Sequence, residues 1–204
     1  MLAENCYVVS DETKEAVIID CGALYEEEAT AIFNYIDKSH LKPVHLLCTH
    51  GHFDHCIGNG AIFGRYGLKP EVHIEDKFLM DKIQGQTEDM LGVRIHIDVP
   101  PVGKYLSEDD AISFGSHTLK VLHTPGHTPG GIVFYCEEEH TAFSGDTLFR
   151  MSIGRTDFER GSYEEMMNSL QTVLAKLPQN TIVYSGHGPE TTIGDELRYS
   201  PYMR

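Results

Sequence analysis

The chain has 204 residues, of which 41% are hydrophobic and 23% charged, a composition that excludes a disordered or fibrous protein. Thirty-one Asp and Glu residues against sixteen Lys and Arg give a formal charge of −15, which disfavours a nucleic-acid partner. No apolar run approaches the roughly 20 residues of a membrane span, and no signal peptide is visible. We therefore expect a cytoplasmic protein without membrane contact, folded as a single domain over residues 1–204.

Strands and helices alternate along the first half of the chain. The β-type runs Tyr7–Val9 and Ala16–Asp20 predict a hairpin, and a helical spacing of apolar residues starts at Glu26. The nearly unbroken apolar run Val44–Thr49 is typical of a buried strand. The remaining elements predicted here are a helix over Gly58–Tyr66, a strand over Glu71–Ile74, and an acidic helix start followed by a loop between Lys77 and Pro101.

The second half of the chain is rich in strands and ends with one clear helix. Five strands are predicted, over Ala111–Phe114, His117–His123, Gly131–Tyr135, Thr141–Ser144 and Thr181–Tyr184. Ser162 and Glu165 have the spacing of a capping box, which predicts a helix over Tyr163–Leu177 that Pro178 ends. Groups of strands separated by helices indicate an α/β fold in which helices cover sheets.

Four potential metal ligands stand within six residues after the strand Val44–Thr49. The sequence there reads H-x-H-x-D-H, formed by His50, His52, Asp54 and His55. Gly51 allows the tight loop that turns His50 and His52 toward one ion. Asp54 and His55 then point in another direction and can serve a second ion. A chance occurrence of this pattern is rare even with twelve histidines.

Three further candidate ligands follow later strands, each beside a glycine. His127 lies in the stretch HTPGHTPGG, Asp146 in SGDT and His187 in SGHGP. Together with the first four they make seven ligands, a number that suits two divalent ions with one bridging carboxylate. Imidazole and carboxylate groups without thiolates suit zinc, iron or manganese. We expect two divalent ions, with zinc first and iron or manganese as alternatives.

This ligand set resembles that of the metallo-β-lactamase superfamily over nearly the whole chain. The resemblance implies a four-layer αββα sandwich with the metal site at the ends of its sheets. Within the superfamily, the stretches His123–Gly130, Gly145–Phe149, Gly154–Phe158 and Gly186–Pro189 are similar to the compact form of glyoxalase II, a hydroxyacylglutathione hydrolase.

The resemblance also implies a role for each ligand. His50, His52 and His127 would hold the first ion, Asp54, His55 and His187 the second, and Asp146 would bridge the two. The implied reaction is hydrolysis of a thioester such as S-D-lactoylglutathione by a hydroxide held between the ions. Asp54 and Asp146 are the expected catalytic residues, with Asp54 accepting a proton as the intermediate collapses. The expected partner is a small-molecule thioester.

The expected substrate contacts differ from those of larger glyoxalase II enzymes. Those enzymes use a lysine and a tyrosine after the bridging aspartate, and this chain has Gly154-Arg155-Thr156-Asp157-Phe158 there. Arg155 and Asp157 are therefore predicted to line or brace the cleft, with a plain salt bridge as the alternative. Only seventeen residues follow His187, so we expect no C-terminal helical glutathione-binding domain.

Other activities of the same superfamily remain open from the sequence. The stretch Gly154–Phe158 is also similar to persulfide dioxygenases, which would hold one iron with His50, His127 and Asp146. A lactonase and a non-catalytic metal-binding module are further alternatives. The sequence Gly186-His187-Gly188-Pro189 is similar to the hydrolases and favours hydrolysis.

Several residues outside the ligand set also carry expectations. The five cysteines are scattered without C-x-x-C, which predicts free thiols, most of them buried. His123 is expected to orient a ligand, and the other histidines outside the set to be structural or to lie on the surface. Relatives usually have a further strand before the segment at Glu4–Tyr7, so this strand is either missing or the true start lies upstream. If the chain is complete as written, we expect an exposed sheet edge and either a monomer or a homodimer that covers it.

Overall fold

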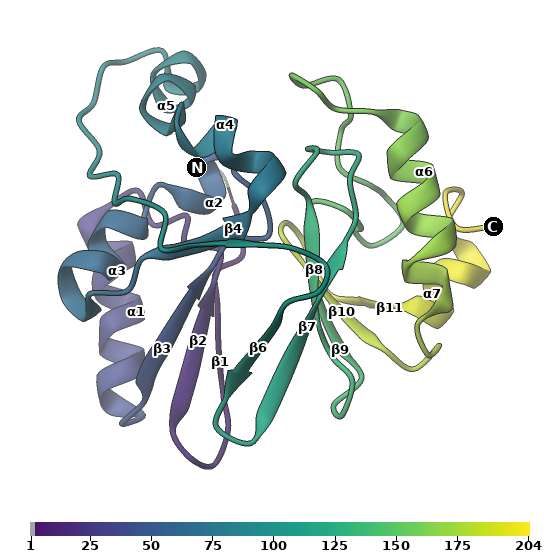
Figure 1. Cartoon of the computed structure of the whole chain (residues 1–204), viewed down its shortest axis with the longest axis horizontal. Helices are drawn as coiled ribbons and strands as arrows, with labels where there is room; N and C mark the ends of the chain where they lie inside the picture. Colours follow the sequence, from purple (N-terminus) through teal and green to yellow (C-terminus); the bar gives the residue numbers. More distant parts are fainter. Residues whose placement is uncertain (1–2) are drawn as a thin grey trace.

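Two β-sheets pack face to face, with helices on both outer faces, in a computed structural model that describes residues 3–204 (Figure 1). One sheet has the strand order β1-β2-β3-β4-β5, and the other has the order β11-β10-β9-β8-β7-β6. The predicted α/β class and the αββα sandwich are therefore confirmed.

The chain builds the two sheets one after the other. The first contains β1 (Tyr7–Ser10), β2 (Glu15–Ile19), β3 (Lys42–Leu47), β4 (Pro70–His73) and β5 (Lys104–Leu106). The second contains β6 (Ala111–Phe114), β7 (His117–His123), β8 (Ile132–Cys136), β9 (Thr141–Gly145), β10 (Ile182–Ser185) and β11 (Thr191–Thr192). Strands β2 to β5 are parallel, whereas β9 and β10 form the parallel pair of the second sheet.

Alternation along β2 explains why this sheet has helices on one face and a second sheet on the other. Val17 and Ile19 point toward the second sheet, where they share a buried cluster with Phe134. Ile18 points to the opposite face and packs with Ile36 of a covering helix. Successive side chains of a strand point to opposite faces, so a strand with four consecutive buried apolar residues needs cover on both sides.

The helices lie on the outside of the sandwich, as Figure 1 shows for α1 and α3 on one side and α6 and α7 on the other. Their bounds are α1 (Glu26–Lys38), α2 (Phe53–Cys56), α3 (Asn59–Tyr66), α4 (Lys77–Met80), α5 (Ile83–Leu91), α6 (Tyr163–Thr172) and α7 (Ile193–Tyr199), with 3₁₀ turns at Ile74–Asp76 and Leu174–Lys176. Met166 and Leu170 of α6 pack against Val183 of the second sheet.

Several sequence expectations need correction. The helix predicted over Tyr163–Leu177 ends at Thr172, and a 3₁₀ turn replaces its last turn. Val173 leaves ideal helical geometry, with φ −110° and ψ −67°, although the apolar spacing continues. Four short elements were not predicted, namely α2, β5, β11 and α7, because segments of two to seven residues carry too little periodicity. The segment after Lys77 contains α4 and α5 rather than one helix start.

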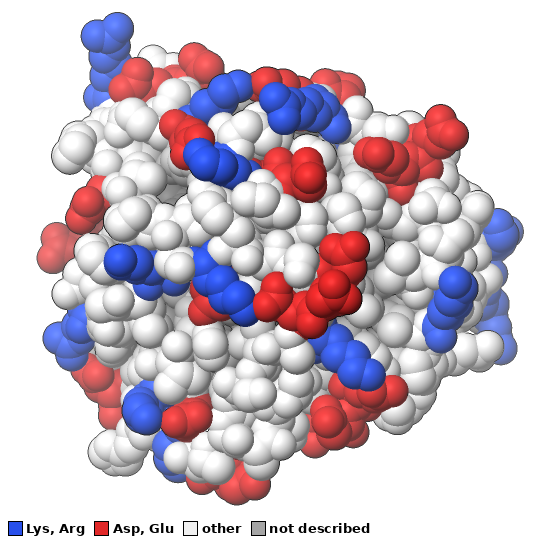
Figure 2. All heavy atoms as spheres, in the orientation of Figure 1, with Lys and Arg blue, Asp and Glu red and all other residues white. Residues whose placement is uncertain are grey.

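The surface carries interspersed charges. On the face that Figure 2 shows, Lys and Arg side chains lie among Asp and Glu side chains. Some of them pair, as Lys82 does with Glu159 at 2.8 Å. In the part of the chain that the structure describes, no helix is long and apolar enough to cross a membrane. The five cysteines all lie within that part and are free, as predicted.

Candidate metal centre

The seven predicted ligands lie together at one edge of the sandwich, where four strands end. They come from both sheets and are positioned by the loops or short helices that follow β3, β7, β9 and β10. His50 and His52 follow β3, Asp54 and His55 belong to α2, His127 lies in the turn after β7, Asp146 follows β9, and His187 follows β10.

Three histidines form the first group. The ring centroid of His50 lies 4.9 Å from that of His52 and 4.8 Å from that of His127. Nδ1 of His52 lies 2.8 Å from Nε2 of His127. One nitrogen from each of the three residues therefore faces a common point.

Hydrogen bonds behind these rings leave the inward nitrogens with free lone pairs. Nδ1 of His127 donates to the backbone carbonyl of Arg155 at 2.6 Å, so its Nε2 is unprotonated in the neutral ring. The Thr49 hydroxyl donates to Asp20 at 2.7 Å and therefore accepts from Nδ1 of His50, 3.1 Å away. Nε2 of His50 is buried and has no hydrogen-bond partner. A metal ion is the partner that such a nitrogen lacks.

Asp54, His55 and His187 form the second group. Oδ2 of Asp54 lies 3.5 Å from Nε2 of His187 and 3.9 Å from Nε2 of His55. Nδ1 of His55 donates to Asp20 at 2.9 Å, which leaves its fully buried Nε2 without a partner. The group therefore offers two imidazole nitrogens and one carboxylate oxygen.

Asp146 lies between the two groups, with one oxygen toward each. Its Oδ2 is 3.5 Å from Nε2 of His127, and its Oδ1 is 3.4 Å from Nε2 of His55. Oδ1 is buried without a hydrogen-bond partner. Gly186 permits this close arrangement, since a Cβ there would lie 2.4 Å from Oδ1 of Asp146 and 2.8 Å from the ring of His55.

The first group has the protonation states of metal ligands without an ion. Burial lowers the pKa of His52 to about 3 and lowers the pKa of His50 and His127, so these rings are neutral. Burial opposes ionisation of Asp146, but His55 and its neighbours lower the pKa of that carboxyl to about 2. Neutral imidazoles beside an ionised carboxylate are the forms that bind a divalent cation.

In the second group, burial opposes protonation of His55, but the carboxylates of Asp20 and Asp146 raise its pKa. The hydrogen bond with Asp54 raises the pKa of His187. These two rings therefore release a proton when a cation binds.

These residues fit two divalent ions. The first group and the second group each supply three donors, and Asp146 offers a different oxygen to each. Three of the donor atoms are buried without partners, namely Nε2 of His50, Nε2 of His55 and Oδ1 of Asp146. Leaving them unpartnered is costly, and cations satisfy all three together.

Two buried aspartates that support the ligands were not predicted. Asp20 accepts hydrogen bonds from Thr49 and His55. Asp76 accepts from the backbone N–H of Gly51 at 2.8 Å and of Gly130 at 2.7 Å, and thus ties together the two loops that carry the first group. Asp20 ends one predicted strand and Asp76 follows another, positions similar to that of Asp146, but neither stands beside a glycine as Asp146 does.

A cavity of about 260 Å³ opens beside the centre. Leu79 of α4, Met90 of α5 and Phe158 give it apolar walls, and Asp89 and Glu159 add acidic groups. Helices α4 and α5, in the segment after Lys77, therefore form one side of the cavity. The cavity is large enough for a small acyl group and part of its carrier.

The two predicted substrate residues pair with each other beside this cavity. Arg155 donates two hydrogen bonds to Asp157, at 2.6 and 2.7 Å, and both side chains are exposed. The guanidinium also lies 4.1 Å from the ring centroid of Phe158. Phe158 lines the cavity, whereas Arg155 and Asp157 are not among its lining residues. Their contact with substrate remains a prediction.

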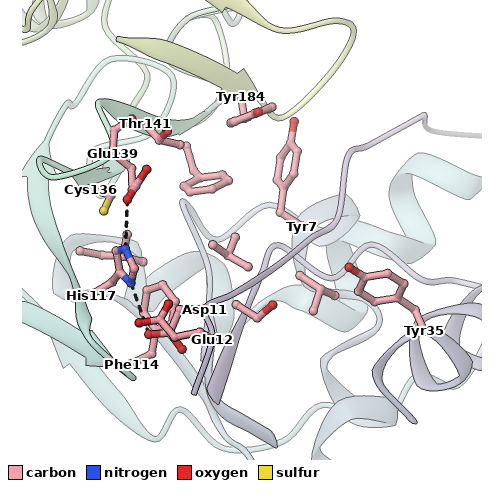
Figure 3. Close-up of a pocket in the computed structure, with 15 residues that line it drawn as sticks. Tyr7, Asp11, Glu12, Tyr35, Phe114, His117, Cys136, Glu139, Thr141 and Tyr184 are labelled. Carbon is pink, nitrogen blue, oxygen red and sulfur yellow. Dashed lines mark hydrogen bonds and ion pairs between the residues drawn. The ribbon is translucent and has the colours of Figure 1, made fainter. Parts of the chain in front are cut away.

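A larger cavity of about 570 Å³ lies between β1 and strands of the second sheet (Figure 3). Its lining includes Tyr7, Tyr184 and His117 (Figure 3). The His117 ring is held between carboxylates of Asp11 and Glu139, each 3.3 Å away. Both nitrogens of this histidine are partnered, whereas His50 and His55 of the metal centre each have a buried Nε2 without a hydrogen-bond partner among the described residues.

Comparison with known proteins identifies the family. Residues 2–187 match the family model described as the metallo-beta-lactamase superfamily, and the chain belongs to it. The protein named hydroxyacylglutathione hydrolase GloC from Haemophilus influenzae is 35% identical, over 98% of this chain and 92% of that protein. The fold and the His/Asp cluster are those of a dinuclear metal-binding family of metallo-hydrolases.

Solved structures agree with this assignment. The BLEG-1 B3 metallo-beta-lactamase superposes with a TM-score of 0.89 at 35% identity, covering 98% of this chain and 94% of that chain. The protein TTHA1623, solved in a di-iron-bound form, superposes with a TM-score of 0.84 at 35% identity and the same coverage. ETHE1 from Myxococcus xanthus has a TM-score of 0.80 at 27% identity, covering 98% of this chain and 80% of that chain.

Proposed function

We propose that this metallo-beta-lactamase superfamily member is a hydrolase that uses two divalent ions to cleave small-molecule thioesters such as S-D-lactoylglutathione. The observation that carries the proposal is the position of Asp146, whose two oxygens face two separate ligand groups. The similarity to a protein named hydroxyacylglutathione hydrolase supports the thioester as substrate.

The bound ions would supply a polarised carbonyl and a water that loses its proton near neutral pH. The chain contributes a base beside them. Burial opposes ionisation of Asp54, but the hydrogen bond with His187 lowers the pKa of that carboxyl. Asp54 is therefore a carboxylate at neutral pH, and its partly exposed side chain can accept a proton at Oδ2.

The cavity orients the substrate. Leu79 and Phe158 exclude water from its apolar wall, which suits the methyl or alkyl part of an acyl group. Gln86 lies on the same wall, and its amide nitrogen is held by the backbone carbonyls of Gly51 and Leu79. A rigid wall beside the centre restricts the acyl group to few orientations and so favours attack on its carbonyl.

The second ligand group distinguishes this proposal from a persulfide dioxygenase. A single-iron site would need only His50, His127 and Asp146, and it would leave Nε2 of His55 buried without a partner. Persulfide dioxygenation is therefore the alternative activity to be tested. Lactone opening uses the same centre and is the other activity to be measured.

The test is an assay of metal-reconstituted protein. Protein freed of metal and reloaded separately with zinc, iron(II) or manganese is mixed with S-D-lactoylglutathione, and thiol release is followed. We expect metal-dependent release that is lost in Asp54→Ala and retained in the surface variant Asp37→Ala. If no metal supports thiol release and the protein consumes oxygen with glutathione persulfide, the proposed hydrolase activity is wrong and the protein is a persulfide dioxygenase. Turnover of lactones but not of thioesters would show that the substrate is a lactone.

A further inference from the structure

A second set of potential ligands lies outside the metal centre, where the two sheets meet beside strand β4. It contains His73 at the end of β4, His123 at the end of β7, and Glu108 in the connection from β5 to β6. One ligand atom from each residue lies within 4.8 Å of the others. The imidazole rings stack with centroids 4.2 Å apart, and a carboxylate oxygen of Glu108 lies 4.0 Å from Nε2 of His73.

His73 carries an unsatisfied polar atom that points into this set. The residue is 2% exposed, and its Nε2 is buried without a hydrogen-bond partner. Burial, and then the neighbouring His123, lowers the pKa of His73, so the ring is neutral. A neutral imidazole with an unpartnered buried nitrogen is a form that a metal ion stabilises.

The hydrogen bond of His123 leaves its other nitrogen free for a ligand. Nε2 donates to the backbone carbonyl of Pro129 at 2.8 Å, since a carbonyl only accepts. The neutral ring therefore has its lone pair on Nδ1. A ring N–H held by a backbone carbonyl is the arrangement that orients metal-binding histidines in proteins.

We propose that His73, His123 and Glu108 bind a third divalent transition-metal ion of the zinc class, separate from the two ions of the metal centre. Two imidazoles and one carboxylate, with water as a fourth ligand, form a donor set typical of zinc. Tetrahedral ligands about 2.1 Å from an ion lie about 3.4 Å from one another. Closing from at most 4.8 Å to that spacing requires movement of the exposed Glu108 side chain and a small shift of the His123 ring that keeps its hydrogen bond to Pro129.

Binding through Nε2 of His73 shifts the proton of the ring to Nδ1. The backbone N–H of Glu75 lies 3.4 Å from Nδ1, and this long hydrogen bond is given up. A metal–nitrogen bond at a buried site outweighs one hydrogen bond at the limit of its distance range.

The proposed site is structural rather than catalytic. An ion there joins the end of β4 in the first sheet to the end of β7 in the second, and also fixes the β5–β6 connection. Through the carbonyl of Pro129 it supports the turn that carries His127. We therefore expect the ion to raise the melting temperature, with no change in the reaction catalysed.

Counting bound metal tests the site without reference to activity. Metal-free protein is titrated with zinc, unbound metal is removed, and the zinc per chain is measured by mass spectrometry. We expect three equivalents in the wild type and two in His73→Gln and Glu108→Gln. Glu108 is 65% exposed, so its variant retains the fold even if a substitution at buried His73 does not.

The matched control is His117→Gln. His117 also lies beside carboxylates, but both of its nitrogens are partnered (Figure 3), so its variant should keep three equivalents. Two equivalents in the wild type would overturn the proposal, as would three equivalents in Glu108→Gln with unchanged zinc affinity. Because Glu108 lies outside the catalytic cavity, its variant should hydrolyse thioester at the wild-type rate. The zinc count therefore tests the third site, and the hydrolysis rate tests the proposed function, independently of each other.

Discussion

The carboxylate of Asp76 accepts a hydrogen bond from the backbone N–H of Gly51, 25 residues earlier in the chain, at 2.8 Å. Its other oxygen accepts from Gly130, which follows His127 by three residues. One buried side chain therefore fixes the spacing between the loop that carries His50 and His52 and the turn that carries the third histidine of their group.

We expect Asp76→Asn to weaken both the fold and metal binding. An asparagine turns an NH₂ group toward a backbone N–H that needs an acceptor, which costs about 1–3 kcal/mol in the free energy of unfolding. Urea denaturation and zinc titration measure the two effects. Asp81→Asn is the matched control, because Asp81 is exposed and pairs only with Lys77. Equal zinc affinity in both variants would show that Asp76 does not position the ligands.

Replacing the bridging residue, as in Asp146→Ala, should abolish turnover while the fold persists. Each of its oxygens faces a different ligand group, so the variant weakens both sites at once. We expect thioester hydrolysis to fall more than about 100-fold, beyond the loss typical of a supporting residue. Circular dichroism checks the fold, and metal analysis checks occupancy. Asp37→Ala, an exposed substitution at a residue that pairs with Arg65 outside the ligand set, is the comparison. Substantial turnover in Asp146→Ala would contradict the proposed centre.

Asp20→Asn should reduce activity through His55 rather than through direct contact with substrate. Asp20 accepts the Nδ1–H of His55 at 2.9 Å and so sets the orientation of its ring. Loss of such a carboxylate lowers metal affinity or activity by about 10–100-fold. The informative measurement is metal dependence, because excess metal should restore much of the rate. If the rate of Asp20→Asn stays low even at saturating metal, Asp20 instead contributes directly to catalysis.

Gly186→Ala should disrupt the centre by steric overlap. The added Cβ would lie 2.4 Å from Oδ1 of Asp146, so that the carboxylate must move away from His55. We expect reduced metal content and little activity. Gly64→Ala is the control, since its Cβ meets no atom within 4 Å and replaces a glycine inside helix α3. That change should stabilise the protein by about 0.5–1 kcal/mol in thermal or urea unfolding. Normal metal content in Gly186→Ala would show that the loop can shift at no cost to the ligands.

The pair of His45 and Glu71 should make stability depend on pH. Nδ1 of His45 lies 2.6 Å from Oε1 of Glu71 on the neighbouring strand, and this hydrogen bond raises the pKa of the histidine in the folded state. The stabilisation is therefore fully present below the unfolded pKa, about 6.5, and is lost as pH rises through the higher folded value. Wild type should exceed Glu71→Gln by about 0.5–1 kcal/mol near pH 6, and by less near pH 9.

Urea unfolding at several pH values measures this difference. A double-mutant cycle with His45→Gln isolates the pair, since the second substitution should have no further pH-dependent effect once Glu71 is replaced. A constant difference between wild type and Glu71→Gln across the pH range would show that the ion pair does not contribute.

Local sequence patterns were sufficient for most of the sandwich. The strand predicted over Val44–Thr49 exists as Lys42–Leu47, two residues earlier, and was predictable because burial on both faces requires continuous apolar residues. The helix that begins after Ser162 was predictable because that side chain accepts a hydrogen bond from the Glu165 N–H, as its spacing indicated. Segments of a few residues were not predictable, because α2 and β11 form through tertiary contacts and carry no periodic pattern of their own.

The ligand types and their strand-end positions were determined by the sequence itself. Adjacent ligands such as His50 and His52 are a local signal, and His127, Asp146 and His187 each follow a recognisable strand. What only the tertiary structure decided is which atoms meet. Asp20 reaches His55 across 35 residues and Asp76 reaches Gly130 across 54, because neighbouring strands and the two facing sheets bring their ends to one edge. Such contacts depend on sheet order and on the packing between sheets, neither of which leaves a pattern in the residues around a single aspartate.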